Sequence, residues 1–92
     1  MVLFRCENGN LVNLEKALYF KTTSGTVEYD GGIPIKGVIV LAIFGYDDGD
    51  FGTPLATFKS KKEAQDFIDS LGKIMATENN KVLTVDDVCK KK

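Results

Sequence analysis

VIVLAIF, residues 38–44, contains the clearest structural signal in this sequence. All seven of its residues are apolar, four of them are β-branched, and a glycine lies on each side of the run. This composition is typical of a central strand that is buried on both faces. Strand alternation places Ile39, Leu41 and Ile43 on one face and the other four residues on the opposite face. Both faces therefore need cover.

An amphipathic helix that can supply part of this cover lies further along the chain. Ser60 and Glu63 have the spacing of a capping box, in which the serine hydroxyl accepts the Glu63 amide and the carboxylate reaches back to the Ser60 amide. Apolar residues then recur at helical spacing, namely Ala64, Phe67, Ile68, Leu71, Ile74 and Met75. A helix of about 16 residues is roughly 24 Å long, enough to cover one face of a small sheet.

Only one of the two rows of the central strand can lie under this helix. The other row can be hidden by curling of the sheet, by the N-terminal strands, or by contact with another subunit or partner. All three alternatives remain open at this point. Under the third, Ile39, Leu41 and Ile43 are the candidate residues of an oligomer interface.

Turn signals divide the N-terminal part of the chain into short strands. Asn8-Gly9 is a strong hairpin signal between two short extended segments. Ser24-Gly25 predicts a two-residue turn, and the alternating strand that follows it should place Val27 and Tyr29 on the same face. Residues 84–87 can either cap a last short helical turn that carries Val88 and Cys89 or stay without regular structure.

Two further breaks complete the pattern and lead to the expected fold. Residues 30–32, Asp-Gly-Gly, predict a turn, and Pro34 confines the residues after it to a sheet edge or a connection. A last strand is expected around residues 54–58. We predict a single α+β domain over residues 1–88, an antiparallel β-meander of about five strands with one long amphipathic helix near the C-terminus packed on one face. Residues 89–92 are expected to form a basic, disordered tail.

The composition argues against several classes of chemistry. The 92 residues include twelve Lys+Arg and thirteen Asp+Glu, are 43% hydrophobic, and contain no His. The chain therefore lacks the commonest general base, the commonest zinc ligand, and the Ser-His and Cys-His nucleophile pairs. A net charge of −1 also lacks the basic excess of a typical nucleic-acid-binding domain. We expect a protein that is not an enzyme and needs no cofactor.

Positive charge gathers in the second part of the chain. Residues 1–58 carry four basic and seven acidic residues, whereas residues 59–92 carry eight lysines and six acidic residues. Lys59, Lys61 and Lys62 form a candidate binding patch, although lysines at a helix start are usually no more than solvated.

A second candidate patch combines an aromatic ring with lysines. Tyr19 and Lys21, with Lys36 expected nearby, are a thin version of the aromatic and basic surfaces that bind single-stranded nucleic acid. Arginine, the usual reader of phosphate and guanine, occurs only once in the chain. Nucleic acid is therefore a less favoured partner than protein.

The acidic turn and the cysteines suggest little chemistry. Asp47, Asp48 and Asp50 are weak candidates for a cation site, but hairpin turns favour Asp and Gly for backbone reasons, and we predict no metal. Cys6 and Cys89 lie near opposite ends of the chain and belong to no C-x-x-C pair. A disulfide between them is the less favoured alternative to two reduced thiols.

The expected compartment follows from what the chain does not contain. Its first six residues lack the basic-then-apolar layout of a secretory signal. No segment approaches the roughly 18 consecutive apolar residues of a membrane span. We expect a cytoplasmic protein without a membrane partner.

The layout of a β-meander followed by a capped helix is similar to that of many small bacterial and phage proteins. The helix start, Ser-x-x-Glu-Ala-x-x-Phe-Ile-x-x-Leu over residues 60–71, identifies no family. We expect a small protein that acts through a protein–protein surface, as a homo-oligomer, for example as an accessory or inhibitory protein of a phage or mobile element. The alternatives are a single-stranded nucleic-acid-binding protein and a small-ligand or nucleotide-binding module.

Overall fold

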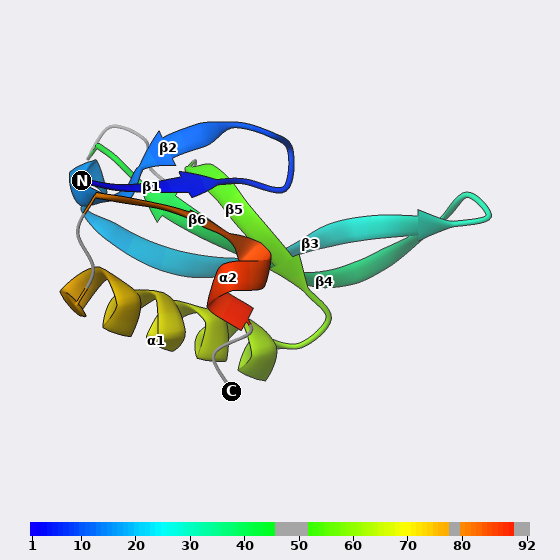
Figure 1. The fold of residues 1–92 in the computed structure, drawn as a ribbon. Coiled ribbons are helices and arrows are strands. Elements are labelled where there is room, and N and C mark those ends of the chain that lie inside the picture. The colour runs from blue at the N-terminus through cyan, green and yellow to red at the C-terminus, as the bar shows by residue number, and fades with distance from the viewer. Residues whose placement is uncertain (46–51, 78–79, 90–92) are drawn as a thin grey trace.

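Six strands in the described part of the chain form two three-stranded sheets, and one long helix packs beside them (Figure 1). The computed structural model describes residues 1–45, 52–77 and 80–89. The first sheet has the order β2-β1-β6 and consists of Val2–Arg5 (β1), Leu11–Asn13 (β2) and Lys81–Thr84 (β6). The second has the order β3-β4-β5 and consists of Tyr19–Asp30 (β3), Ile33–Ile43 (β4) and Thr53–Phe58 (β5). The helical elements are η1 (Leu14–Lys16), α1 (Lys61–Thr77) and α2 (Val85–Cys89).

The α+β class and the long helix near the C-terminus are confirmed, but the single five-stranded meander is wrong. The N-terminal strands form a sheet of their own, in which β1 pairs antiparallel with β2 and parallel with β6. A parallel partner must be reached by a crossover connection, and α1 lies within the crossover that leads to β6. β6 escapes sequence-based prediction because its apolar residues, Val82 and Leu83, are adjacent and so show no alternation.

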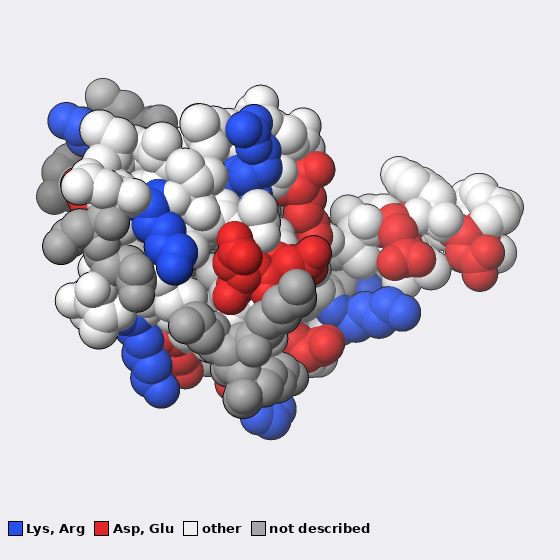
Figure 2. Space-filling view, in the orientation of Figure 1, with Lys and Arg blue, Asp and Glu red and all other residues white. Residues whose placement is uncertain are grey.

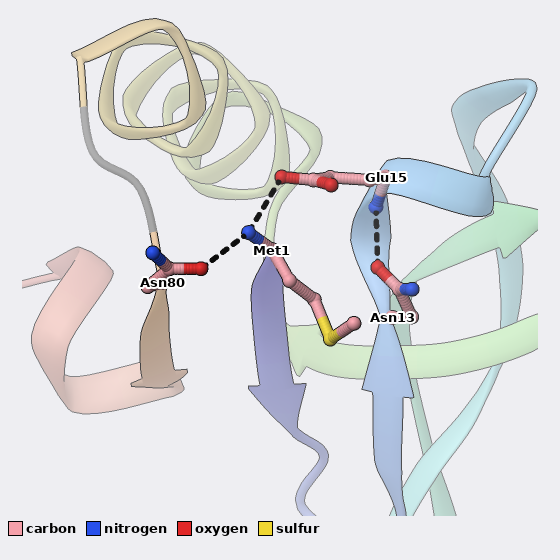
Figure 3. A network of polar contacts seen from close by, with 4 residues as sticks. All are labelled: Met1, Asn13, Glu15 and Asn80. Atoms are coloured by element: carbon pink, nitrogen blue, oxygen red, sulfur yellow. Dashed lines mark hydrogen bonds and ion pairs between the residues drawn. The ribbon is translucent and has the colours of Figure 1, made fainter.

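Polar contacts join the first sheet to its neighbouring turns (Figure 3). The amino group of Met1 donates a hydrogen bond to Asn80 Oδ1 at 3.0 Å and lies 3.3 Å from Glu15 Oε2. The Asn13 side chain accepts the Glu15 amide at 3.1 Å and so caps η1. Asn80 has a left-handed φ of 53°, which Asn adopts more readily than most residues. These contacts place the start of β6 beside the start of β1.

β4 is the central strand of the second sheet, as the apolar run predicts, and it pairs antiparallel with both β3 and β5. The turn predicted at Ser24-Gly25 is wrong, because both residues lie inside β3, opposite Val38 and Gly37. The chain turns at Gly31-Gly32 instead, where two consecutive glycines have φ values of 58° and 87°. Two positive φ values are what the tight turn of a two-residue hairpin requires.

The predicted helix is confirmed and begins directly after its predicted cap. The Ser60 hydroxyl accepts the Glu63 amide at 3.2 Å and donates to the Glu63 carboxylate, also at 3.2 Å. The apolar stripe faces inward, and its fully buried members are Ala64, Phe67, Leu71 and Ile74. The helix contacts all three strands of the second sheet, as expected for a helix packed on one face.

One apolar core lies between the two sheets and α1. The ring of Phe67 in α1 lies 5.9 Å from that of Phe4 in β1 and 5.3 Å from that of Phe58 in β5, measured between centroids. β4 contributes Val40 and Ala42, both completely buried, to the same core. Aromatic pairs of this kind add about 0.5–1.5 kcal/mol beyond the burial of their area. Phe67 therefore holds three separate elements together.

The other face of β4 is also largely covered within the chain. Leu41 is 7% and Ile43 1% exposed, whereas Ile39 is half-buried. Gly52 lies against this row, since a Cβ at its position would stand 2.5 Å from Ile43 Cδ1. The N-terminal strands pack on the opposite face of β4, which is the face that carries Val40. A role of this row in an oligomer interface stays a prediction.

The C-terminal segment begins with a second capping box. The Thr84 hydroxyl accepts the Asp87 amide at 3.2 Å, and the Asp87 carboxylate accepts the Thr84 amide at 2.9 Å. Of the two alternatives left open for this segment, the short helical turn is the one that forms. α2 ends at Cys89, and residues 90–92 of the predicted tail lie outside the described residues. Of the helices described, none has the length and apolar character needed to cross a membrane.

Candidate protein-binding surface

The two most exposed large apolar side chains of the described residues belong to a two-stranded arm. β5 pairs with β4 only over residues 38–42, so residues 33–36 of β4 have β3 as their one strand partner in the described chain. Figure 1 shows this end of the β3–β4 hairpin projecting from the body of the protein. We call residues 26–36, which include the turn, the arm.

Two glycines and a β-bulge mark the base of the arm. Gly25 of β3 lies directly opposite Gly37 of β4. A Cβ at Gly37 would stand 2.5 Å from the Phe58 carbonyl oxygen and 2.8 Å from the methyl groups of Val27, so glycine permits this close approach. Val27 is the extra residue of the bulge in β3. Bulges bend a strand and increase its twist, and this one lies where the hairpin leaves β5.

The bulge changes which side chains share a face of the arm. Tyr29 lies opposite Pro34, so it shares the face of β4 to which Pro34 belongs. The Val27 methyl groups lie against Gly37, and strand alternation puts Gly37 on the face opposite to Pro34. The prediction that Val27 and Tyr29 share a face is therefore wrong. Strict alternation in the sequence cannot reveal a bulge, because the extra residue is defined only by the partner strand.

One face of the arm combines two carboxylates with two isoleucines. Glu28 lies opposite Ile35, and Asp30 lies opposite Ile33, so the four residues form two adjacent cross-strand pairs. We call these four residues the acidic face. Ile33 is 69% exposed, and Tyr29, on the reverse side, is 70% exposed. Figure 2 shows acidic and uncharged side chains making up the outer part of the arm in that view.

The predicted aromatic and basic patch is divided by the structure. Tyr19 and Lys21 share one face of the second sheet, opposite Ile43 and Leu41. Lys36 lies on the arm opposite Thr26, and its place in the alternation of β4 puts it on the other face. Tyr19 is 48% exposed and Lys36 is exposed. The three side chains do not converge on a single surface.

The lysines before and within the start of α1 are solvent-exposed. Lys59 precedes the cap, and Lys61 and Lys62 occupy the first turn of the helix. Lys62 lies 3.5 Å from the Asp66 carboxylate, four residues along, in an exposed i,i+4 pair. Such pairs contribute a few tenths of a kcal/mol, and this one adds a negative charge to the patch.

The described residues contain no group of three or more His, Cys, Asp and Glu side chains able to hold a metal ion. The weak cation candidates Asp47, Asp48 and Asp50 lie outside the described residues. Cys6 and Cys89, which are both described, carry thiols and are not joined by a disulfide. Burial, with a smaller contribution from the Glu7 carboxylate, raises the pKa of the Cys6 thiol, which disfavours its reactive thiolate form.

A cavity of about 510 Å³ lies between β5, α1 and α2. Its apolar wall is formed by Phe58, Phe67 and Val88, and its polar rim by exposed side chains of α1. The acidic side chains of this rim bond to neighbours on or beside the same helix, in the pairs Glu63 with Ser60, Asp66 with Lys62, and Asp69 with Gln65. These are ordinary contacts of a helix surface and indicate no particular reaction.

Sequence reasoning recognises the turn at the end of the arm but not the arm itself. The signals are present: an Asp-Gly-Gly turn between Tyr29 and Ile33, and one further glycine on either side, at Gly25 and Gly37. These signals indicate a projecting arm only because the pairing of β5 with β4 ends at Val38, and that end point is visible only in the strand register. Without that information, Ser24-Gly25 looks like a turn and shortens the expected hairpin.

Comparison of the chain with protein families, with curated proteins and with solved structures finds no match in any of the three.

Proposed function

We propose that this chain is a small non-enzymatic protein-binding domain, that the arm is its contact element, and that it forms homo-oligomers through the arm. The observation that carries this proposal is the exposure of Tyr29 and Ile33, at 70% and 69%, on either side of the arm's turn. Large apolar side chains at the end of a projecting hairpin contribute little to the core of their own chain. In contact with a partner each can bury most of its surface.

The arrangement of the arm supports binding to protein rather than to nucleic acid. The acidic face of the arm carries Glu28 and Asp30, which repel phosphate. Lys36 is the only basic residue of the arm as a whole. Hairpins with an exposed edge and alternating side chains are a recurrent means of protein recognition. A cytoplasmic location and a role as an accessory or inhibitory protein fit a small chain with two thiols, and both belong to this proposal.

Sedimentation equilibrium of the purified chain, from about 20 μM to 1 mM, tests the proposal. The wild type should show a mass that rises with concentration, and a Tyr29→Ser/Ile33→Ser variant should remain at the 10.1 kDa of one chain. The matched control is Leu18→Ser/Tyr19→Ser, which removes one aliphatic and one aromatic side chain that are 45% and 48% exposed on the body. A wild type that stays monomeric at 1 mM, or an arm variant that associates like the control, overturns the proposal.

A further inference from the structure

We propose that the arm of one copy docks on the outer face of the β2-β1-β6 sheet of a second copy. The inference rests on the proposed function and names the surface that receives the arm. The partner is thus a second copy of this chain, and the contact joins two different surfaces rather than one surface to itself.

The outer face of the first sheet carries three aliphatic side chains and one arginine, with the polar Asn13 and Thr84 in the same two cross-strand rows. In β1, Val2 and Phe4 are buried in the core, so alternation turns Leu3 and Arg5 outward. The register places Val82 beside Leu3 and Leu11 beside Arg5 on the same outer side. We call this outer side, formed by Leu3, Arg5, Leu11 and Val82, the receiving face.

Two of the three apolar members of the receiving face are strongly exposed. Val82 is 52% and Leu11 46% exposed, and Met1, two residues before Leu3 in the chain, is 54% exposed. Figure 2 shows basic side chains among uncharged ones over this part of the molecule. Large aliphatic side chains that neighbour one another on an outer sheet face form a continuous apolar patch, which is the usual mark of a contact surface.

Charge makes the two surfaces complementary. The acidic face of the arm offers Glu28 and Asp30, and the receiving face offers the guanidinium of Arg5. The Arg5 side chain is exposed, and its Nη1 donates to the Gly9 carbonyl at 3.0 Å, which holds the guanidinium against the β1–β2 loop. In this position the guanidinium keeps further N–H donors, so it can donate to both oxygens of a carboxylate in a bidentate pair.

The dimensions of the two surfaces also match. The four residue pairs of the arm span about 13 Å along the strands and roughly 10 Å across. The receiving face is three strands wide and about four residues long, or roughly 14 by 13 Å. Isoleucines on the arm can therefore meet leucine and valine on the sheet while the acidic groups reach Arg5. A contact of this size falls in the weak, transient class of interfaces, so association is expected only at high micromolar concentrations or above.

Charge reversal on each surface tests the inference without disturbing the core. Arg5→Glu should abolish self-association, as should Glu28→Lys/Asp30→Lys, with an increase in the dissociation constant of about tenfold or more in each case. The matched control is Lys73→Glu, an exposed charge reversal on α1 that should leave association unchanged. Circular dichroism should show the wild-type fold for all three variants, because every altered residue is exposed.

Mixing the two non-associating variants gives the decisive result. The reversed arm of one protein then meets the reversed receiving face of the other, while the unaltered arm of the second meets the unaltered receiving face of the first. A 1:1 mixture should therefore regain association, with a mass that rises above the 10.1 kDa that each variant shows alone. Failure of the mixture to associate overturns the inference, as does an Arg5→Glu protein that associates normally. If Arg5→Glu associates normally while the arm variants do not, the proposed function survives and only the receiving face is wrong.

Discussion

Removal of the arm should leave a folded protein, because the core does not extend into it. The variant replaces residues 26–36 with Asn-Gly and so joins Gly25 to Gly37 through a two-residue hairpin turn. The retained pair lies directly opposite across the ladder, as the residues that flank Gly31-Gly32 do in the natural turn. Asn-Gly is among the preferred sequences for this turn.

The magnitude of the stability change follows from burial. No residue of the arm belongs to the buried core, and only Val27 and Ile35 are half-buried. Complete burial of such a side chain stabilises a protein by about 1.5–3 kcal/mol, so the loss of two half-buried side chains should cost about 1.5–3 kcal/mol together. The entropy saved by ordering nine fewer residues acts in the opposite direction. We expect the free energy of unfolding to change by no more than about 3 kcal/mol.

Urea unfolding followed by circular dichroism measures this change. The variant should unfold in one cooperative transition, with a somewhat smaller m-value because it exposes less surface. Phe67→Ala in the full chain is the positive control for a true core lesion. A variant without a cooperative transition, or one destabilised by more than about 4 kcal/mol, would show that the arm is part of the folding unit, and the account of it as a contact element would then be refuted.

The remaining predictions concern the core, the base of the arm and the buried thiol. Phe67→Ala should lower the free energy of unfolding by about 3–5 kcal/mol in urea titrations, because the ring fills the space between three elements, and a loss below 1 kcal/mol would contradict this packing. Gly37→Ala should destabilise the protein by about 1–3 kcal/mol, since the new Cβ meets the Phe58 carbonyl oxygen, whereas an unchanged transition midpoint would mean that the strands separate freely at the base of the arm. Cys6 should resist alkylation by iodoacetamide at pH 8 in the folded protein and react in urea, as peptide mass mapping can show. The folded-state pKa of the Cys6 thiol is raised, so burial of the neutral thiol stabilises the protein below the unfolded-state thiol pKa. This contribution is lost as the pH rises toward the folded-state pKa. Cys6→Ala should remove this pH dependence of the free energy of unfolding.

The elements that local sequence determines are the ones that it predicts. The apolar run of residues 38–44 indicates a central strand in any arrangement, and the Ser60 cap specifies the start of the helix from neighbouring residues alone. β6 and the turn misplaced at Ser24-Gly25 depend on partners elsewhere in the chain. Lys81–Thr84 becomes a strand because β1 accepts it, and Gly25 stays extended because Gly37 lies opposite. Tertiary pairing overrides local signals at such positions.

The candidate surface could not be predicted for a related reason. Individual residues such as Tyr29 and Ile33 look like ordinary strand residues, and their exposure follows from the point at which β5 stops pairing with β4. The lysine patches, in contrast, are visible in the sequence, but the register separates Lys36 from Tyr19 and Lys21. A pattern of residue types therefore identifies faces of a strand, whereas the convergence of faces is a property of the sheet.

Photo-crosslinking from the end of the arm can show whether the arm contacts a second copy of the chain. A photoreactive benzoylphenylalanine is placed at Ile33 or, as a control on the body, at Leu18, which is 45% exposed. Each protein is irradiated alone at about 1 mM and in an extract of the cells that express the chain. We expect covalent protein adducts from position 33, which map in the purified sample to residues 1–13 and 81–84 of a second copy. Adducts from position 33 no more abundant than those from position 18, in both samples, would contradict this expectation.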